Sequence, residues 1–122
     1  MPSHNAPSQN KLLSSLGLCA RARALVFGTP MVCEAVREPG KIALVLEAAD
    51  TSDGTHKRLT DKCTHYGVRL VRLDVTGEEL AAALGKHRFL AAVALGDGQL
   101  CRMIEQYLPQ PAAQASPGGS LS

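Results

Sequence analysis

Two short runs of apolar residues constrain the fold of this chain more than any other feature. They are KIALVLEA, over residues 41–48, and FLAAVAL, over residues 89–95. Neither run alternates between apolar and polar residues, and both are far too short to span a membrane. Continuous apolar strands are typical of sheets that are covered on both faces. The two runs therefore predict strands in the middle of a sheet that lies between helices.

Segments with helical spacing separate these strands. Five helices are expected: one over about residues 9–21, one over 30–37, a third that ends near 65, a fourth that begins at 76 and a last one after 98. Further strands are expected over residues 24–27 and 68–75. The sharpest local signal is at Thr76 and Glu79, which fit a capping box, with Val75 and Leu80 as the matching hydrophobic staple. This order predicts an α/β fold, a three-layer α/β/α sandwich with a four-stranded mixed sheet. The charges in strand 68–75 place it nearer an edge.

The 122 residues are enough for one domain. Residues 1–8 are polar and contain two prolines, and residues 110–122 are rich in Pro, Gly, Ser, Ala and Gln without charge. We therefore expect a disordered N-terminus over 1–8, a folded domain over 9–109 and a flexible tail over 110–122. No signal peptide and no membrane-length apolar run are visible, so we expect a cytoplasmic location without a membrane partner.

The composition limits the kinds of site that the chain can carry. The formal net charge is only +2, so any contact with nucleic acid must come from a local basic patch. Two Phe, two Tyr and no Trp are too few for a row of stacking rings. The four cysteines are irregularly spaced, and Cys63 and His65 are two residues apart, which is unfavourable for two metal ligands on a helix. We interpret the cysteines as reduced thiols packed as small apolar side chains, and we expect no metal and no cofactor.

No group of residues in the sequence suggests catalysis. Phosphate-binding loops, dinucleotide-binding glycine motifs and nucleophile elbows are absent from the sequence. Asp50 follows a buried strand, where α/β proteins often bind ligands, but alone it is better explained as a turn or capping residue. His87 has no nucleophile near it in the sequence. We therefore predict that the protein is not an enzyme.

The sequence FGTP suggests a binding feature. Gly28 can adopt an unusual φ or admit a close partner, Thr29 can cap a helix, and Pro30 suits a first helical position. A helix start of this kind attracts phosphate, although an ordinary helix start would look the same. Two basic groups could flank it, one formed by Arg21 and Arg23 and the other by Lys86, His87 and Arg88. Their importance depends on whether the fold brings them together.

Three blocks of sequence resemble a known family. They are KLLSSLGLCARARALVFG, then AVREPGKIALVLEAADTSDGTHKRLTDKCTHYGVRL, then GEELAAALGK followed by AAVAL. In this order they are similar to the bacterial YlxQ-like branch of the kink-turn-binding ribosomal proteins, the L-seven-Ae family, over about residues 9–108. The resemblance implies an α/β/α sandwich that binds structured RNA, kink-turn or ribosomal. It also implies RNA contact by residues 28–34 and 86–90, and we add ribosome association and a monomeric state as expectations.

Three residues depart from the family pattern. Where characterised members carry Asn, Glu and Lys, this chain has Pro30, Met31 and Glu34. Asn and Glu side chains hydrogen-bond base edges, and those of Pro and Met do not. A second hypothesis is therefore a protein-interaction module that kept the fold and lost specific kink-turn recognition. Phe89 could stack on a base, but as part of an apolar strand we expect it in the core.

Overall fold

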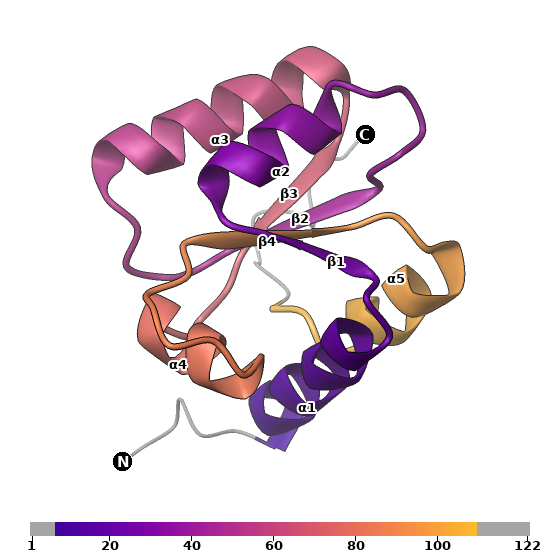
Figure 1. The fold of residues 1–122 in the computed structure, drawn as a ribbon, viewed down its shortest axis with the longest axis vertical. Helices are drawn as coiled ribbons and strands as arrows, with labels where there is room; N and C mark the ends of the chain where they lie inside the picture. The colour runs from indigo at the N-terminus through magenta and orange to yellow at the C-terminus, as the bar shows by residue number, and fades with distance from the viewer. Residues whose placement is uncertain (1–6, 110–122) are drawn as a thin grey trace, which may run out of the picture.

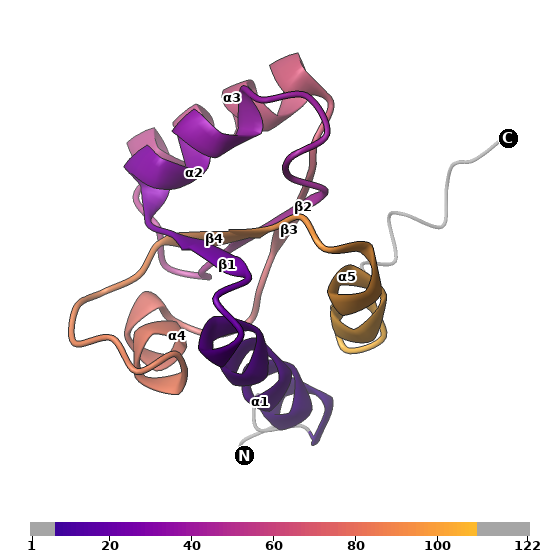
Figure 2. The ribbon, with the colours of Figure 1, turned by 45° about the vertical axis from the view of Figure 1, so that its right-hand side comes forward.

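Helices and strands alternate along residues 7–109, the part of the chain that the computed structural model describes (Figure 1). In chain order the elements are α1 (Pro7–Arg21), β1 (Leu25–Phe27), α2 (Thr29–Val36), β2 (Leu44–Glu47), α3 (Asp53–Tyr66), β3 (Arg69–Arg72), α4 (Gly77–Ala83), β4 (Ala92–Leu95) and α5 (Gly98–Glu105). In Figures 1 and 2, α2 and α3 cover one face of the sheet, and α1, α4 and α5 cover the other. The three-layer sandwich is thus confirmed. Among the described helices, none has the length and apolar character needed to cross a membrane.

The four strands form one mixed sheet in the order β1-β4-β2-β3. β4 runs antiparallel to both of its neighbours, so that Leu95 faces Leu25 on β1 and Leu44 on β2, whereas β2 and β3 are parallel. Every residue of β2 and β4 is buried, and β3, with its arginines exposed, lies at an edge. The two covered strands and the charged edge strand agree with the prediction.

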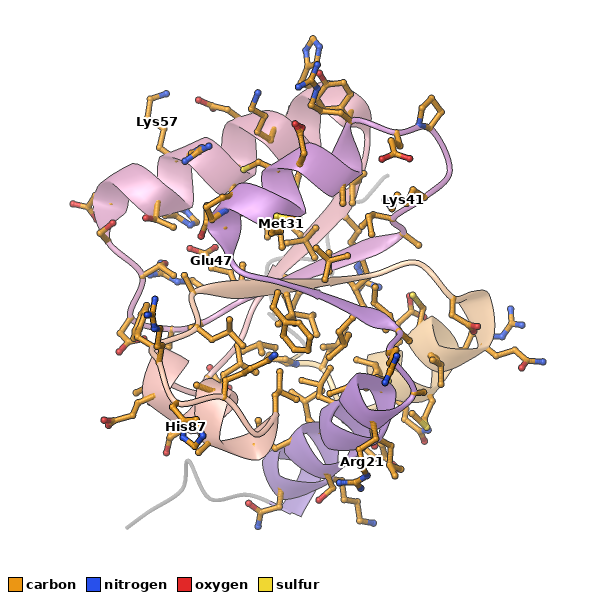
Figure 3. All side chains as sticks on the ribbon, viewed as in Figure 1. Arg21, Met31, Lys41, Glu47, Lys57 and His87 are labelled. Atoms are coloured by element: carbon orange, nitrogen blue, oxygen red, sulfur yellow. The ribbon has the colours of Figure 1, made fainter. Side chains whose placement is uncertain are left out.

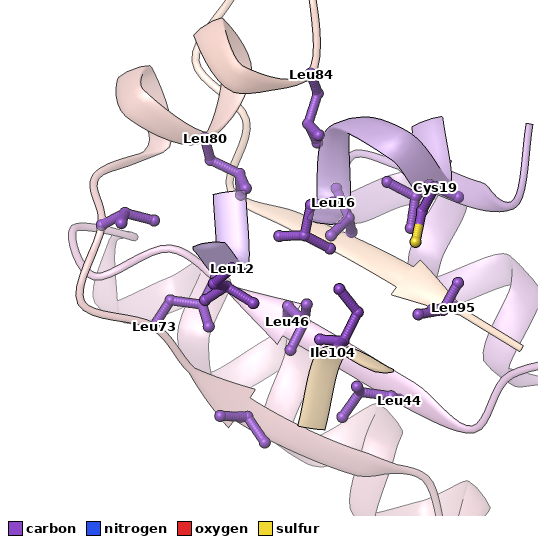
Figure 4. Packing of buried hydrophobic residues seen from close by; sticks show 14 of the residues in the cluster. Leu12, Leu16, Cys19, Leu44, Leu46, Leu73, Leu80, Leu84, Leu95 and Ile104 are labelled. Carbon is purple, nitrogen blue, oxygen red and sulfur yellow. The ribbon is translucent and has the colours of Figure 1, made fainter. Parts of the chain in front are cut away.

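The apolar runs are continuous because the two faces of the sheet bury separate clusters. Leu44 and Leu46 face the cluster under α1, α4 and α5, whereas Val45 between them faces the cluster under α2 and α3. Figure 4 shows the first cluster, in which side chains from α1, α4 and α5 meet, among them Leu12, Leu16, Leu80 and Ile104. Burying each such side chain contributes about 1.5–3 kcal/mol, so these clusters are the main source of stability.

Local signals determine several helix ends as predicted. The Thr76 hydroxyl accepts a hydrogen bond from the Glu79 N–H at 3.0 Å, and the Glu79 carboxylate accepts one from the Thr76 N–H at 2.9 Å. Val75 and Leu80 are buried in the same cluster, as a hydrophobic staple requires. Gly67 ends α3 with a φ of 70°, a conformation that glycine adopts at low cost.

Element boundaries differ from the prediction by a few residues. α1 begins at Pro7 rather than at residue 9, and each strand is shorter than its apolar run. Flanking residues still donate hydrogen bonds across the sheet, as Ala48 does to the Ala91 carbonyl oxygen at 2.8 Å, although they lie outside the strands. Residues 1–6 and the predicted tail 110–122 lie outside the described residues. Pro7 and Ser8, expected in the disordered N-terminus, are instead the first residues of α1.

Gly96 is a position at which the fold has no room for a side chain. A Cβ there would overlap the backbone carbonyl oxygen of Lys41. We expect Gly96→Ala to lower the free energy of unfolding by at least about 2 kcal/mol, because backbone must move. Gly98→Ala is the matched control, since nothing lies within 4 Å of a Cβ there, and its stability should be unchanged or higher. Urea denaturation measures the free energy of unfolding of both variants. An equal loss of stability in the two would contradict the lack of room at Gly96.

Candidate nucleic-acid interface

One end of the sheet brings together two segments that are distant in sequence. Phe27, at the end of β1, pairs with Val93 near the start of β4. The next residue, Gly28, donates its N–H to the carbonyl oxygen of Ala92 at 2.9 Å. The start of α2 therefore lies beside the loop 85–91 that leads into β4. The two segments that the family resemblance assigned to RNA contact are neighbours in the fold.

Gly28 determines how α2 leaves the sheet. Its φ of 88° and ψ of 148° are rarely adopted by residues with a side chain, which confirms the expected special glycine. The helix begins at Thr29, one residue earlier than predicted, so Gly28 is the N-cap and no side chain caps the helix. The predicted capping role of Thr29 is wrong, because a capping side chain must come from the residue before the first helical one.

The first turn of α2 exposes both apolar side chains and backbone donors. Pro30 has no N–H, so Thr29 and Met31 carry the donors of the first three helical positions. Met31 is 59% exposed and points away from the core (Figure 3). In the next turn the Arg37 guanidinium lies 3.4 Å from the Glu34 carboxylate. Arg37 therefore offsets part of the negative charge that Glu34 adds to this face.

Two ring contacts hold the loop before β4. The Lys86 ammonium lies 4.1 Å from the centre of the Phe27 ring, a cation–π contact that ties the loop to β1. Further along, Phe89 lies against Gly77, where a Cβ would collide with its ring. The Leu90 N–H donates to the Gly77 carbonyl oxygen at 3.1 Å. These contacts fix the loop between β1 and the start of α4.

Phe89 does not join the core, and that prediction is wrong. It is 52% exposed, and β4 begins three residues later, at Ala92. The hydrogen bond from Leu90 to Gly77 holds this segment beside α4 instead of in the sheet. The ring lies against Gly77 and about half of the side chain is open to solvent, so it is accessible for stacking by a base.

A hollow of 380 Å³ lies between this loop and α4. Lys86, His87, Arg88 and Phe89 line one side, and Asp50, with Glu78, lines another. The Asp50 carboxylate accepts a hydrogen bond from the Gly77 N–H at 2.8 Å, so its predicted capping role is confirmed. The hollow combines cations, carboxylate acceptors and an exposed ring, which together can contact phosphate and base edges.

The basic residues at the end of α1 also reach this region. Arg21, Arg23 and Lys86 line one groove of 530 Å³ between α1, β1 and the end of α4. Arg21 and His87 both lie on the α1/α4 side of the sheet in Figure 3. The fold thus brings together the two basic groups that the sequence left separate.

A buried carboxylate is the feature that the sequence analysis missed. Glu47 ends β2, is fully buried, and lies on the α2/α3 side of the sheet (Figure 3). Its carboxylate accepts a hydrogen bond from the Thr51 hydroxyl and lies 2.9 Å from Nδ1 of His56. Arg72 donates to the Ala49 carbonyl oxygen at 3.0 Å and lies 3.4 Å from the same Thr51 hydroxyl. This network holds the turn between β2 and α3, next to the candidate interface.

A signal for Glu47 was present in the sequence. A charge inside an otherwise apolar run must find partners if the run is buried. Thr51 and His56 follow it closely in sequence and could have been matched to it. The continuous apolar character of the run outweighed this single residue.

The cysteines have the properties of packed apolar side chains. All four are buried and free. Burial raises the pKa of Cys63 to about 11, with smaller contributions from the neighbouring Cys33 and Glu47, and burial also raises the pKa of Cys19 and Cys101. Such thiols are poor nucleophiles at neutral pH. Within residues 7–109, no group of three or more His, Cys, Asp or Glu side chains is arranged to hold a metal ion.

Comparison with known proteins gives a consistent picture. A family model described as the ribosomal protein L7Ae/L30e/S12e/Gadd45 family matches residues 10–103. The RNA-binding protein YlxQ of Bacillus subtilis (strain 168) is 32% identical over 89 residues, which are 73% of this chain and 87% of the relative. The RNA-binding protein YlxQ of Enterococcus faecium is 30% identical over 84 residues, 69% of this chain and 80% of the relative.

Two solved structures are similar in fold. A protein with unknown function from Bacillus halodurans C superposes with a TM-score of 0.71 and 34% identity, covering 80% of this chain and 95% of that one. The Giardia lamblia 15.5kD RNA binding protein superposes with a TM-score of 0.67 at 21% identity, covering 88% and 93%. The second similarity, at this identity, concerns the fold alone.

The Glu47 network gives a prediction about stability. Glu47→Ala leaves a cavity and deprives the Thr51 hydroxyl and the His56 ring of their buried partner. We expect the free energy of unfolding to fall by about 3 kcal/mol. Glu34→Ala is the control: this carboxylate is exposed and, within residues 7–109, pairs with Arg37 alone, so the change should be below about 0.5 kcal/mol. Urea denaturation measures the free energy of unfolding of both variants. A loss for Glu47→Ala as small as that for Glu34→Ala would refute the structural role of the network.

Proposed function

Because this chain belongs to the ribosomal protein L7Ae/L30e/S12e/Gadd45 family, we propose that it is a non-catalytic, cytoplasmic RNA-binding protein. Its target is a structured RNA, ribosomal or regulatory, at a sharply bent internal loop of the kink-turn type. The observation that carries the proposal is the adjacency of the start of α2 and the loop 85–91. Relatives named as RNA-binding proteins in two bacteria support the same class of partner.

The chemistry of the interface fits a bent RNA better than a regular helix. The backbone donors of Thr29 and Met31 and the cations of the loop can contact phosphates, while the exposed Phe89 ring offers a stacking surface. Stacking requires a base that has left its helix, and a bent internal loop provides such bases. The Asp50 carboxylate, beside this ring, is an acceptor for base amino groups.

The three departures from the family pattern affect base reading more than phosphate contact. Pro30 and Met31 offer no side-chain hydrogen bonds to base edges, and Glu34 repels phosphate although Arg37 offsets part of its charge. We therefore propose weaker kink-turn recognition than in members that carry Asn, Glu and Lys at these positions.

One observation favours the second candidate, a protein-interaction module. Met31 and Phe89 are both large apolar side chains that are more than half exposed. Exposed large apolar side chains are found on protein-binding surfaces as well as on RNA-binding ones. The RNA experiments below separate the two candidates.

The first test restores the family residues. The triple variant Pro30→Asn, Met31→Glu, Glu34→Lys should bind a kink-turn RNA about tenfold or more tightly than the native protein, because it regains base-edge hydrogen bonds and a cation. Each added phosphate contact should steepen the log–log salt dependence by roughly 0.7–0.9. Fluorescence titrations at several salt concentrations measure both quantities.

The control for this test repeats only the Glu-to-Lys exchange at another place. Glu38→Lys adds two positive units, one more than the triple variant, in which Met31→Glu adds a negative charge. It does so beyond the other end of α2, where Glu38 pairs with Lys41 at 3.2 Å. It should improve binding much less than the triple variant. Tight native binding that the triple variant fails to improve would show that Pro30, Met31 and Glu34 suit RNA as they are. Binding by neither protein would favour the protein-interaction candidate.

The second test displaces the Phe89 ring without a mutation at Phe89 itself. In Gly77→Ala the new Cβ must push the ring aside, which costs little because the ring is at the exposed end of its side chain. We expect an unchanged melting temperature and at least about fivefold weaker RNA binding, since stacking contributes about 1–3 kcal/mol per base. Gly54→Ala, in the first turn of α3 with nothing within 4 Å of its Cβ, is the matched control. Equal RNA binding by the two variants would remove Phe89 from the interface.

A further inference from the structure

The groove between α1 and α4 carries a concentration of unpaired positive charge. Arg21 and Arg23 from the end of α1 and Lys86 from the loop after α4 line its 530 Å³, and no acidic residue lines it. None of the three cations forms an ion pair within residues 7–109. In a chain whose net charge is only +2, three cations around one groove without a counter-charge favour an anionic occupant.

Small residues line the groove where α1 meets α4. Gly17, Ala20 and Ala83 line it together with Leu25, Phe27 and Leu84, and a Cβ at Gly17 would lie 3.2 Å from the carbonyl oxygen of Ala83. The two helices therefore approach closely, and the lining residues other than the three cations have no polar side chain. A shallower hollow of 280 Å³ shares Gly17, Arg21 and Ala83 and extends the groove along α1 to Ser14.

The backbone geometry at the end of α1 places Arg23 at this groove. Arg23 has a φ of 60°, the single positive φ among the described non-glycine residues. The Ala24 N–H donates to the Cys19 carbonyl oxygen at 2.9 Å and the Arg23 N–H to that of Ala20 at 3.0 Å, which closes the helix in the manner that usually uses glycine. A glycine there would avoid a steric cost of about 1 kcal/mol. The arginine thus occupies a position that backbone energetics alone would give to glycine.

The groove is continuous with the candidate interface. Ala82 and Lys86 line both the 530 Å³ groove and the 380 Å³ hollow beside Phe89. Lys86 is held at this boundary by its contact with the Phe27 ring. An RNA strand that leaves the hollow beside Phe89 can therefore pass Lys86 directly into the groove.

We propose that the groove binds the phosphodiester backbone of an RNA strand that continues beyond the bent loop held at the start of α2. The inference rests on the proposed function and extends the RNA footprint along α1. Regularly spaced negative charge without a requirement for base identity matches three cations in a groove whose other lining residues have no polar side chain. An acidic polypeptide would also satisfy the charge, but the continuity with the stacking surface favours RNA.

The test compares one kink-turn RNA with the same RNA carrying about eight additional unpaired uridines at either end, a length within the span of single-strand sites. For the native protein, one of the two extensions should tighten binding about tenfold near 100 mM salt and steepen the log–log salt slope by roughly 1.4, or about 0.7 for each of two contacts. The variant Arg21→Gln/Arg23→Gly should lose this gain, so that it binds the extended and the short RNA with equal affinity. Its melting temperature should be unchanged or higher, because glycine suits the conformation at position 23.

Two further variants and one competitor make the test specific. The control variant Arg58→Gln/Arg102→Gln removes the same charge from α3 and α5 and should keep the affinity gain from the RNA extension. Arg21→Lys/Arg23→Lys preserves the charge of the groove and should keep this gain as well. The groove assignment would be wrong if both double variants with neutralised arginines lost the affinity gain equally. It would also be wrong if the native protein bound the short RNA but gained no affinity from either extension. In both cases the proposed function would still stand. If poly-glutamate displaces the RNA extension as effectively as poly-uridine does, the groove is instead a site for acidic polypeptides. If the native protein binds no RNA of either length, the proposed function itself fails, and the groove assignment with it.

Discussion

β4 forms backbone hydrogen bonds with both β1 and β2, and the place of every candidate binding residue depends on this pairing. Because β4 runs antiparallel to β1, its start lies beside the end of β1. The loop before β4 and the first turn of α2 are therefore neighbours. Because β4 is also antiparallel to β2, the turn after Glu47 reaches the same end of the sheet. Three connections that are far apart in the chain thus form one surface.

Polar contacts help to hold the loops of this surface. The Glu47 carboxylate organises the turn after β2 through Thr51 and His56. From the same turn, Asp50 reaches the N–H of Gly77 at the start of α4, and Gly77 in turn supports the ring of Phe89. A loop fixed in this way loses less conformational entropy when it binds a partner. The buried carboxylate can therefore support binding without touching the ligand.

The charge of the protein is distributed unevenly over its surface. The net charge is small, yet three cations share one groove and His87 and Arg88 lie at the adjoining hollow. The start of α2, in contrast, offers Pro30, Met31 and the Glu34–Arg37 pair. Phosphate attraction is thus strongest along α1 and the loop before β4. In this chain, RNA affinity would depend on these cations more than on base recognition by α2.

The sequence by itself determined the architecture and many of the helix ends. Strand and helix periods, the capping box at Thr76 and the glycine at position 67 act over a few residues, so they can be recognised locally. The family resemblance also pointed to the two segments that prove to be adjacent. Two things were decided only by the tertiary structure: the exposure of Phe89 and the shared groove of Arg21 and Lys86. Each depends on which strands pair, and in which direction, and strand pairing is a non-local property that no local pattern of side chains specifies.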